Sequence, residues 1–277
     1  MDKHLIKHDL VQGLRRKRYL FLPLLFLIPF GTCCYLSRVK EIPGTFLDFL
    51  ISGFAGSPPV EISLYPPRAA EIPIGWLMSV GGCLYLNLDY ILYDLMESGQ
   101  QVIVRTGRRT HWFLSKCIWN VCSCILIFGA MMLMAVVLTV MFRGELNAGK
   151  ITQISEEVYR WFLDSENISV SRLWLAGVLI PFLTVAAMSM LQMTLCLYMK
   201  PVFSFLICLG ILGMSTYISV PWVIGNGAMG IRLILFAEYG TGILPSVLIS
   251  AIVFIGSIIA GLIRFKKMNI LENKVGT

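Results

Sequence analysis

The stretch that decides the fold is CIWNVCSCILIFGAMMLMAVVLTVMF, residues 117–142, which contains no acidic or basic side chain. A helix that crosses the hydrocarbon core of a bilayer needs about 20 mostly apolar residues. Other stretches without Asp, Glu, Lys or Arg run over residues 19–37, 173–199, 201–231 and 239–263. A further stretch, residues 73–95, is apolar until Asn87 and Asp89 near its end. The sequence therefore predicts an all-α integral membrane protein with six transmembrane helices.

The composition supports this class. Of the 277 residues, 57% are hydrophobic and only 14% are charged, which is too little polar surface to cover a soluble globule. This excludes a soluble enzyme fold, a disordered chain and a disulfide scaffold. The net charge of +7 is explained by where the cations lie relative to the membrane, so we expect no nucleic-acid partner.

The distribution of Lys and Arg predicts the orientation. Of the 23 cations, fifteen fall on the side that holds both termini, and eight fall on the other side. The positive-inside rule then places both termini in the cytoplasm of a multi-pass cell-membrane protein. The predicted parts are a cytoplasmic amphipathic helix at 1–18, a six-helix transmembrane domain at 19–263 and a cytoplasmic tail at 264–277. The spans are expected at about 19–37, 73–95, 117–142, 173–199, 201–223 and 240–263.

Two segments outside the spans have a helical pattern, and a third is a short apolar piece. Ile6, Leu10 and Leu14 recur every four residues among basic side chains, which predicts an amphipathic helix under the inner leaflet, with a disordered basic tail as the alternative. In the external loop 38–72, the short apolar piece 46–54 could lie on the bilayer surface. In the external loop 143–172, apolar residues at helical spacing predict an interfacial helix: Ile154, Val158, Trp161 and Phe162.

Catalytic and cofactor motifs are not found in the sequence. Gly213-Met214-Ser215 superficially resembles a nucleophile turn, but the histidines His4, His8 and His111 all fall on the cytoplasmic side, so none can serve as a base for Ser215. The sequence has no G-x-x-x-x-G-K-[ST] motif for nucleotide phosphates. The eight cysteines lie in or beside the spans and are interpreted as packing residues. We therefore expect no enzyme activity, cofactor or metal, and any ATP hydrolysis would occur in a partner subunit.

Ionisable residues near the spans are candidate functional residues. Asp89 and Asp94 at the inner end of the second span would either neutralise an arginine such as Arg105 or, in the case of Asp89, line a cavity. Residues 221–232 hold a proline and three glycines, which predicts a re-entrant or interfacial hairpin on the outer side, with a plain external loop as the alternative. Arg232 ends this segment, and Glu238 is near enough in sequence to compensate its charge.

The loop between the second and third spans carries a family resemblance. Gly99-Gln100-Gln101, then Val104-Arg105-Thr106-Gly107-Arg108-Arg109, and then Trp112 and Lys116 resemble the loop of small six-span permeases found in Firmicutes. The stretch from Gly225-Asn226 through Met229 to Arg232 is similar as well. With the basic N-terminal helix, the span count and the broken outer segment, the whole chain resembles the permeases of type-2 ATP-binding-cassette (ABC) exporters.

This resemblance implies the partners and the mechanism. Two permease subunits, identical or homologous, would form a pore in the lipid membrane, and each would rest on a separate ATP-binding ABC subunit. The chain would export peptides, lipids or drugs. One or two helical turns of the loop would dock on the ATPase through these residues: Glu97, Val102, Ile103, Arg105, Arg108 and Arg109. The alternative is a stand-alone membrane carrier or channel, which would need ionisable residues in mid-membrane.

Overall fold

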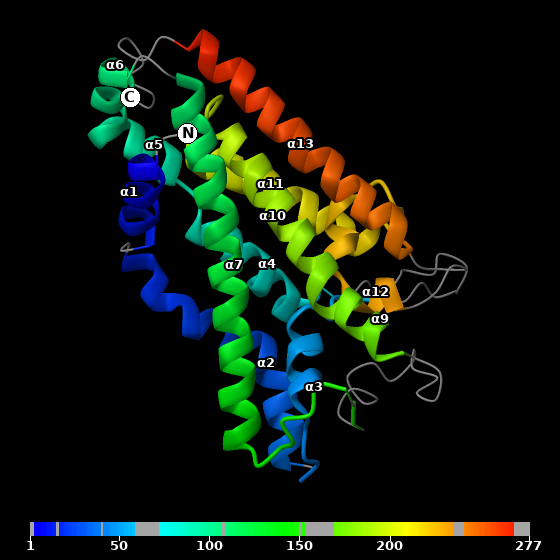
Figure 1. Cartoon of the computed structure of the whole chain (residues 1–277). Helices are drawn as coiled ribbons and strands as arrows, with labels where there is room; N and C mark the ends of the chain where they lie inside the picture. The colour runs from blue at the N-terminus through cyan, green and yellow to red at the C-terminus, as the bar shows by residue number, and fades with distance from the viewer. Residues whose placement is uncertain are drawn as a thin grey trace.

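The computed structural model describes residues 3–14, 17–39, 41–58, 72–106, 109–149, 151–152, 169–234 and 241–268. Within these ranges every named element is helical, and β pairing is limited to an isolated bridge between Thr45 and Glu145. The described part of the chain is therefore an all-α bundle, as predicted (Figure 1).

Three helical stretches are long and apolar enough to cross a membrane. They are α7 (Arg109–Met141), α13 (Ile243–Lys267) and the run Val170–Leu195. This run comprises α9 (Val170–Trp174), a π-helical segment η3 (Leu175–Leu179) and α10 (Ile180–Leu195). The short 3₁₀ helix η1 (Lys17–Phe21) precedes α2 (Leu22–Val39), and α2 and α11 (Pro201–Tyr217) are apolar but shorter.

The segment predicted as a single span at 73–95 is broken in the middle. Helix α4 (Ile74–Leu86) ends at Asn87, a turn follows, and α5 (Tyr90–Asp94) begins beyond it. The break occurs where the Asn87 side chain donates to Asn120 Oδ1 at 3.1 Å and to Ser189 Oγ at 3.0 Å. The 13 residues of α4 extend about 20 Å, which is less than the hydrocarbon thickness of about 30 Å.

Other predicted boundaries also differ. Helix α7 begins at Arg109 rather than at 117, and α11 ends at Tyr217 rather than at 223. The run predicted at 173–199 is helical from Val170 to Leu195, and the one predicted from 240 begins at Ile243. Hydropathy locates these helices, but their ends are determined by capping and by contacts with neighbouring helices.

The prediction that residues 46–54 could lie on the bilayer surface is wrong. Helix α3 (Phe46–Gly53) begins with a capping box in which Thr45 and Asp48 satisfy each other's backbone N–H groups. Residues 47–53 are all buried, and α3 contacts α2 and α7 inside the bundle. Its apolar residues therefore belong to the protein core.

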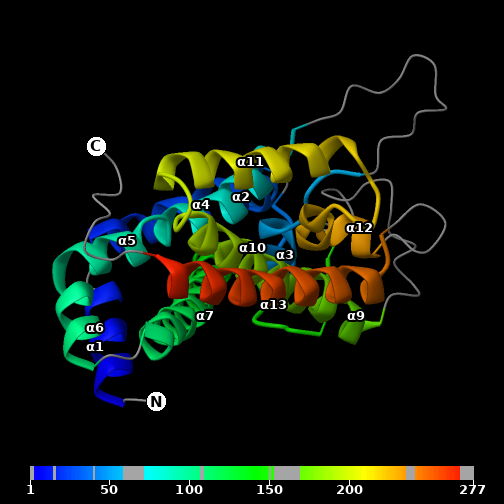
Figure 2. The ribbon, with the colours of Figure 1, turned by 90° about the horizontal axis from the view of Figure 1, so that it is seen from above.

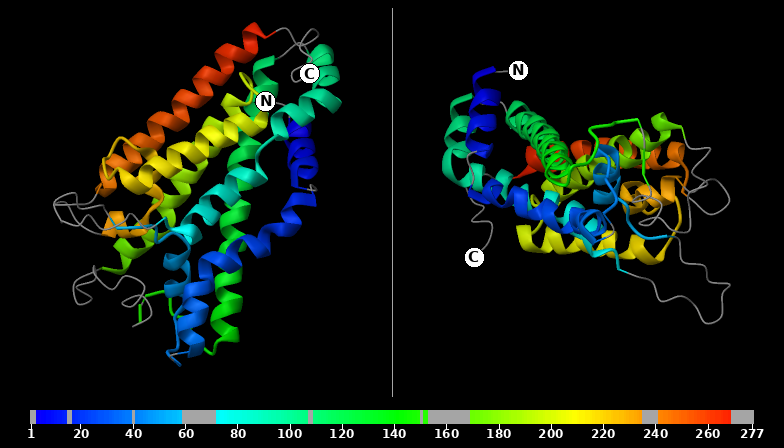
Figure 3. Two further views of the ribbon diagram at one scale, coloured as in Figure 1. Left: turned by 180° about the vertical axis from the view of Figure 1, so that it is seen from behind. Right: turned by 90° about the horizontal axis from the view of Figure 1, so that it is seen from below.

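The two ends of the bundle differ in content. At one end lie α1 (Lys3–Leu14), α5, the π-helical segment η2 (Leu95–Gly99), α6 (Gln100–Thr106), the start of α7 and the end of α13 (Figures 1 and 2). At the other end lie α3, α9 and α12 (Gly230–Ile234), as the reverse view also shows (Figure 3). The chain therefore brings its N-terminal helix beside the loop that follows α4.

The broken segment between α11 and α13 is buried in the protein. It comprises a 3₁₀ helix η4 (Ile224–Ala228) followed by α12, and residues 224–233 are all buried. Other segments satisfy its backbone, because Gly230 N donates to Phe54 O at 2.7 Å and Trp76 Nε1 donates to Ala228 O at 2.8 Å. Irregular backbone of this kind is compatible with an apolar environment only when protein groups satisfy it.

Candidate functional site

A fully buried lysine joins three segments that are distant in the sequence. Lys116 lies near the start of α7, and its Nζ is 2.6 Å from Asp9 Oδ1 of α1 and 2.6 Å from Asp94 Oδ2 of α5. All three side chains are at most 3% exposed. We refer to Lys116, Asp9, Asp94 and Ser115 as the Lys116 cluster.

Neighbouring groups make further contacts with this cluster. Ser115 Oγ donates to Asp9 Oδ2 at 2.6 Å, and Tyr90 Oη donates to the Asp9 carbonyl at 3.0 Å. The ammonium also lies 5.0 Å from the centre of the Tyr90 ring and 4.9 Å from that of Trp112, within the range of cation–π attraction. Buried charges are tolerated when they are paired and hydrogen-bonded in this way.

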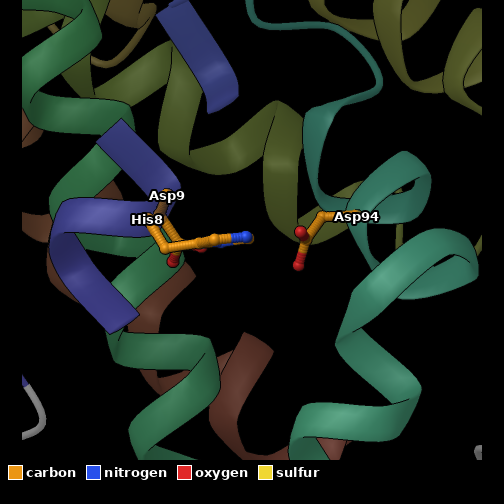
Figure 4. Close-up of side chains that lie close together, drawn as sticks. All are labelled: His8, Asp9 and Asp94. Carbon is orange, nitrogen blue, oxygen red and sulfur yellow. The ribbon is translucent and has the colours of Figure 1, made fainter. Parts of the chain in front are cut away.

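His8 lies at the exposed edge of the Lys116 cluster. Its Nδ1 is 3.7 Å from Asp9 Oδ1, and its side chain is 45% exposed. His8, Asp9 and Asp94 offer possible metal-ligating atoms within 4.8 Å of one another, from α1 and from α5 (Figure 4). The Lys116 ammonium, however, already contacts both carboxylates. The structure therefore supports an ion-pair cluster at this position, with lysine as the cation.

We refer to α5, η2 and α6 together as the 90–106 element. The side chains that it exposes differ in part from those of the predicted docking surface. The element does hold the helical turns that we expected in this loop. Ile103 is only 4% exposed and belongs to a core cluster with Trp112 and Phe265, so it cannot enter a groove on a partner. Among the described side chains of the element, Val104, Met96 and Tyr93 face outward, with exposed fractions of 68%, 58% and 51%. A π-helical segment such as η2 often marks a functional position in a helix.

A second buried cation lies in the broken segment near the other end. The Arg232 guanidinium is fully buried and donates to backbone carbonyls through all three of its nitrogens. The acceptors are Ser57 O at 3.0 Å, Thr216 O at 2.9 Å, Pro58 O at 3.3 Å and Ser215 O, together with the side-chain oxygen of Asn226. Ser215 and Thr216 lie in the last turn of α11, where carbonyls lack helical partners and attract cations. We refer to this arrangement as the Arg232 cage.

A family described as proteins of unknown function, DUF2705, matches residues 20–271. The chain belongs to this family. No curated protein and no solved structure matches it. The geometry of the DUF2705 chain itself is therefore the basis for any statement about its function.

The predicted site residues of the DUF2705 chain that the structure describes make separate contacts with different partners. Asp89 accepts two hydrogen bonds from Arg18, at 3.0 and 2.7 Å, and Asp94 pairs with Lys116, so neither contact needs Arg105. Arg109 donates to the carbonyls of Lys266 and Met268 and ties α7 to the end of α13. The side chains of Glu97 and Arg105, and the whole of Arg108 and Glu238, lie outside the described residues. The expected compensation of Arg232 by Glu238 stays a prediction, and the described partners of Arg232 are the oxygens of the Arg232 cage.

Sequence reasoning missed a buried polar network beside the Lys116 cluster. Asn87, Asn120 and Ser189 bond to one another between α4, α7 and α10, and Ser123 Oγ donates to Asn87 Oδ1. The signal in the DUF2705 sequence was the spacing of Lys116, Asn120 and Ser123, which places all three on one face of α7. Asp9 carried no comparable signal, because it lies 107 positions from its partner.

Proposed function

We propose that this chain is the transmembrane permease subunit of an ABC transporter, an exporter of peptides, lipids or drugs driven by a separate ATPase subunit. In this proposal the chain crosses the cell membrane six times, with both termini in the cytoplasm. The long apolar helices α7, α9–α10 and α13 account for three of the crossings. The shorter apolar segments would supply the others, and a second permease subunit, identical or homologous, would complete the pore.

The observation that carries the proposal is the outward-facing side of the 90–106 element. Met96 and Val104 are exposed on it, while Ile103 joins Trp112 of α7 in a core cluster. The cation distribution assigns this end of the bundle to the cytoplasm. A short helix that exposes apolar side chains from a rigid base, with arginines nearby in the sequence, fits a groove on a partner. The resemblance of this loop to that of ABC permeases favours an ATPase subunit as that partner.

The proposal predicts that a P-loop ATPase is encoded beside this chain. The test is the affinity of the purified chain, in lipid discs, for that subunit. Replacing Met96 and Val104 together by Ser should weaken binding about 30-fold to 1000-fold, since losing an anchor pair costs about 2–4 kcal/mol. Both side chains are exposed, so the fold should survive. Gln101→Ser is the matched control, because Gln101 is an exposed polar residue of α6.

The result has two readings that can be separated. Unchanged affinity of the Met96 and Val104 variant would place the docking surface elsewhere on the chain. Absence of any binding by the unmodified chain would contradict the permease proposal itself. Substituting Val102 and Ile103 is a poorer test than the sequence suggested, because Ile103 contributes to the core.

A stand-alone carrier or channel is the second candidate. The observation in its favour is the buried network of Asn87, Asn120 and Ser189, since polar residues in a membrane bundle often mark a transport path. This candidate predicts that vesicles holding the purified chain alone move a solute without ATP. The permease proposal predicts no such movement until the ATPase is added.

A further inference from the structure

Two carboxylates from different segments meet at one ammonium. Asp9 belongs to α1 and Asp94 to the 90–106 element, and each lies 2.6 Å from Lys116 Nζ. We propose that Lys116 is a shared counter-ion for which α1 and the 90–106 element compete, so that withdrawing one carboxylate strengthens the hold on the other. Lys116 is then the positioning residue that links the N-terminal helix to the docking surface.

The competition follows from the distances within the cluster. One carboxylate oxygen of Asp9 and one of Asp94 lie within 4.8 Å of each other. Two negative charges this close in a buried environment repel each other, and the repulsion opposes the attraction of each carboxylate to Lys116. Whatever else Asp94 contacts, its charge therefore weakens the attachment of Asp9 to Lys116, and the reverse holds for Asp9.

Both segments also rest on the same face of α7. A Cβ at Gly13 of α1 would lie 1.9 Å from Trp119 Nε1, and Trp119 stacks on Tyr90 of α5 with ring centres 3.7 Å apart. A Cβ at Gly99 would lie 3.0 Å from the Trp112 ring. The close fit leaves little room for either segment to shift without changing its distance from Lys116.

The competition predicts that removing one carboxylate tightens the other segment, whereas a merely structural role predicts that it loosens that segment. If the Lys116 cluster were only a brace, removing any of its charges would loosen everything attached to it. If Lys116 is shared, Asp94→Asn should tighten α1, because the repulsion on Asp9 is gone while the ammonium remains. Asp9→Asn should likewise tighten residues 90–99. Each variant keeps one ion pair in the cluster, so the chain should still fold.

Amide hydrogen exchange of the full chain in lipid discs tests this directly. Exchange in α1 and in residues 90–99 is measured relative to α3, which lies at the other end of the bundle. Asp94→Asn should slow the relative exchange of α1 by about fivefold or more, the lower range of typical site-to-site coupling. Tyr90→Phe is the matched control, because it removes the direct hydrogen bond from α5 to α1 and should speed exchange in α1.

This exchange experiment tests the inference on the chain alone, without the ATPase subunit. Faster or unchanged relative exchange of α1 in Asp94→Asn would overturn the shared counter-ion. A second arm rests on the proposed function: adding the ATPase should change exchange in α1 for the unmodified chain but not for Asp94→Asn. If the ATPase fails to bind at all, the proposed function fails, while the result of the first arm stands.

Discussion

Lys116 and Arg232 are both fully buried cations, and the protein stabilises them in different ways. The Lys116 cluster sets two carboxylates from separate segments against one ammonium. The described contacts of the Arg232 cage are backbone carbonyls, the Ser57 hydroxyl and the Asn226 amide oxygen, with no carboxylate among them. The first arrangement compensates charge with charge, and the second compensates it with dipoles at the end of α11.

This difference determines what each cation does for the fold. Removing Lys116 would leave two buried anions facing each other, so the charge balance is the sensitive feature there. Removing Arg232 would leave neutral carbonyls without donors, so the sensitive feature is the fork-like geometry of its donors. The Lys116 cluster can respond to a charged or moving partner, whereas the Arg232 cage holds an irregular segment in one conformation.

The largest effect should come from Lys116→Met. Leaving the two carboxylates without their cation should lower the free energy of unfolding by about 3–5 kcal/mol. Denaturant titration of the protein in mild detergent measures this loss. The matched control is the triple variant Asp9→Leu, Lys116→Met and Asp94→Leu, which removes every charge and should recover most of the stability. A loss below about 1 kcal/mol in the single variant would mean that the ion pairs are not what holds the cluster.

Arg232→Lys should have the next largest effect. Lysine keeps the charge but cannot reach acceptors on three sides, so some carbonyls lose their donors at a cost of about 2–3 kcal/mol. Arg232→Met should cost a similar amount if geometry outweighs charge in the cage. The same titration compares the two variants. Full stability of Arg232→Lys would show instead that the positive charge alone is sufficient.

Gly99→Ala should have the smallest effect of the three. The new Cβ would lie 2.9 Å from the Asp94 carbonyl and 3.0 Å from the Trp112 ring, which overpacks this end of the bundle by about 1–3 kcal/mol. Gly129→Ala is the control, because no heavy atom lies within 4 Å of the new Cβ on α7. Alanine there should leave stability unchanged or raise it by up to about 1 kcal/mol. Equal effects at both glycines would argue against close packing at Gly99.

Sequence reasoning located the helices better than it located the contacts between them. The uncharged run within α7 and the apolar run of α13 are long enough to predict a helix at each position. The helix predicted over 73–95 is interrupted where Asn87 bonds to residues on α7 and α10, and no local pattern in the sequence indicates those partners. The burial of α3 could not be predicted either, since an eight-residue segment rich in apolar side chains is compatible with a membrane surface and with a protein core.

The candidate site was harder to predict for the same reason. Lys116 follows the loop cations Arg105, Arg108 and Arg109 in the sequence, and nothing near it indicates that Asp9 is its partner. The helical turns of α6 were expected, but a run of three apolar residues does not reveal that Ile103 faces inward and Val104 outward. The compensation of Arg232 by carbonyls has no side-chain signature at all.

The most direct test of the permease proposal is ATP hydrolysis by the chain alone and with its ATPase, in the same lipid vesicles. The proposal predicts that the isolated chain hydrolyses no ATP, because its sequence lacks a nucleotide-binding loop. It also predicts that the ATPase subunit hydrolyses ATP while bound to the chain, and that replacing Met96 and Val104 by Ser releases it. Hydrolysis by the isolated chain, or an ATPase that never associates with it, would contradict the proposal.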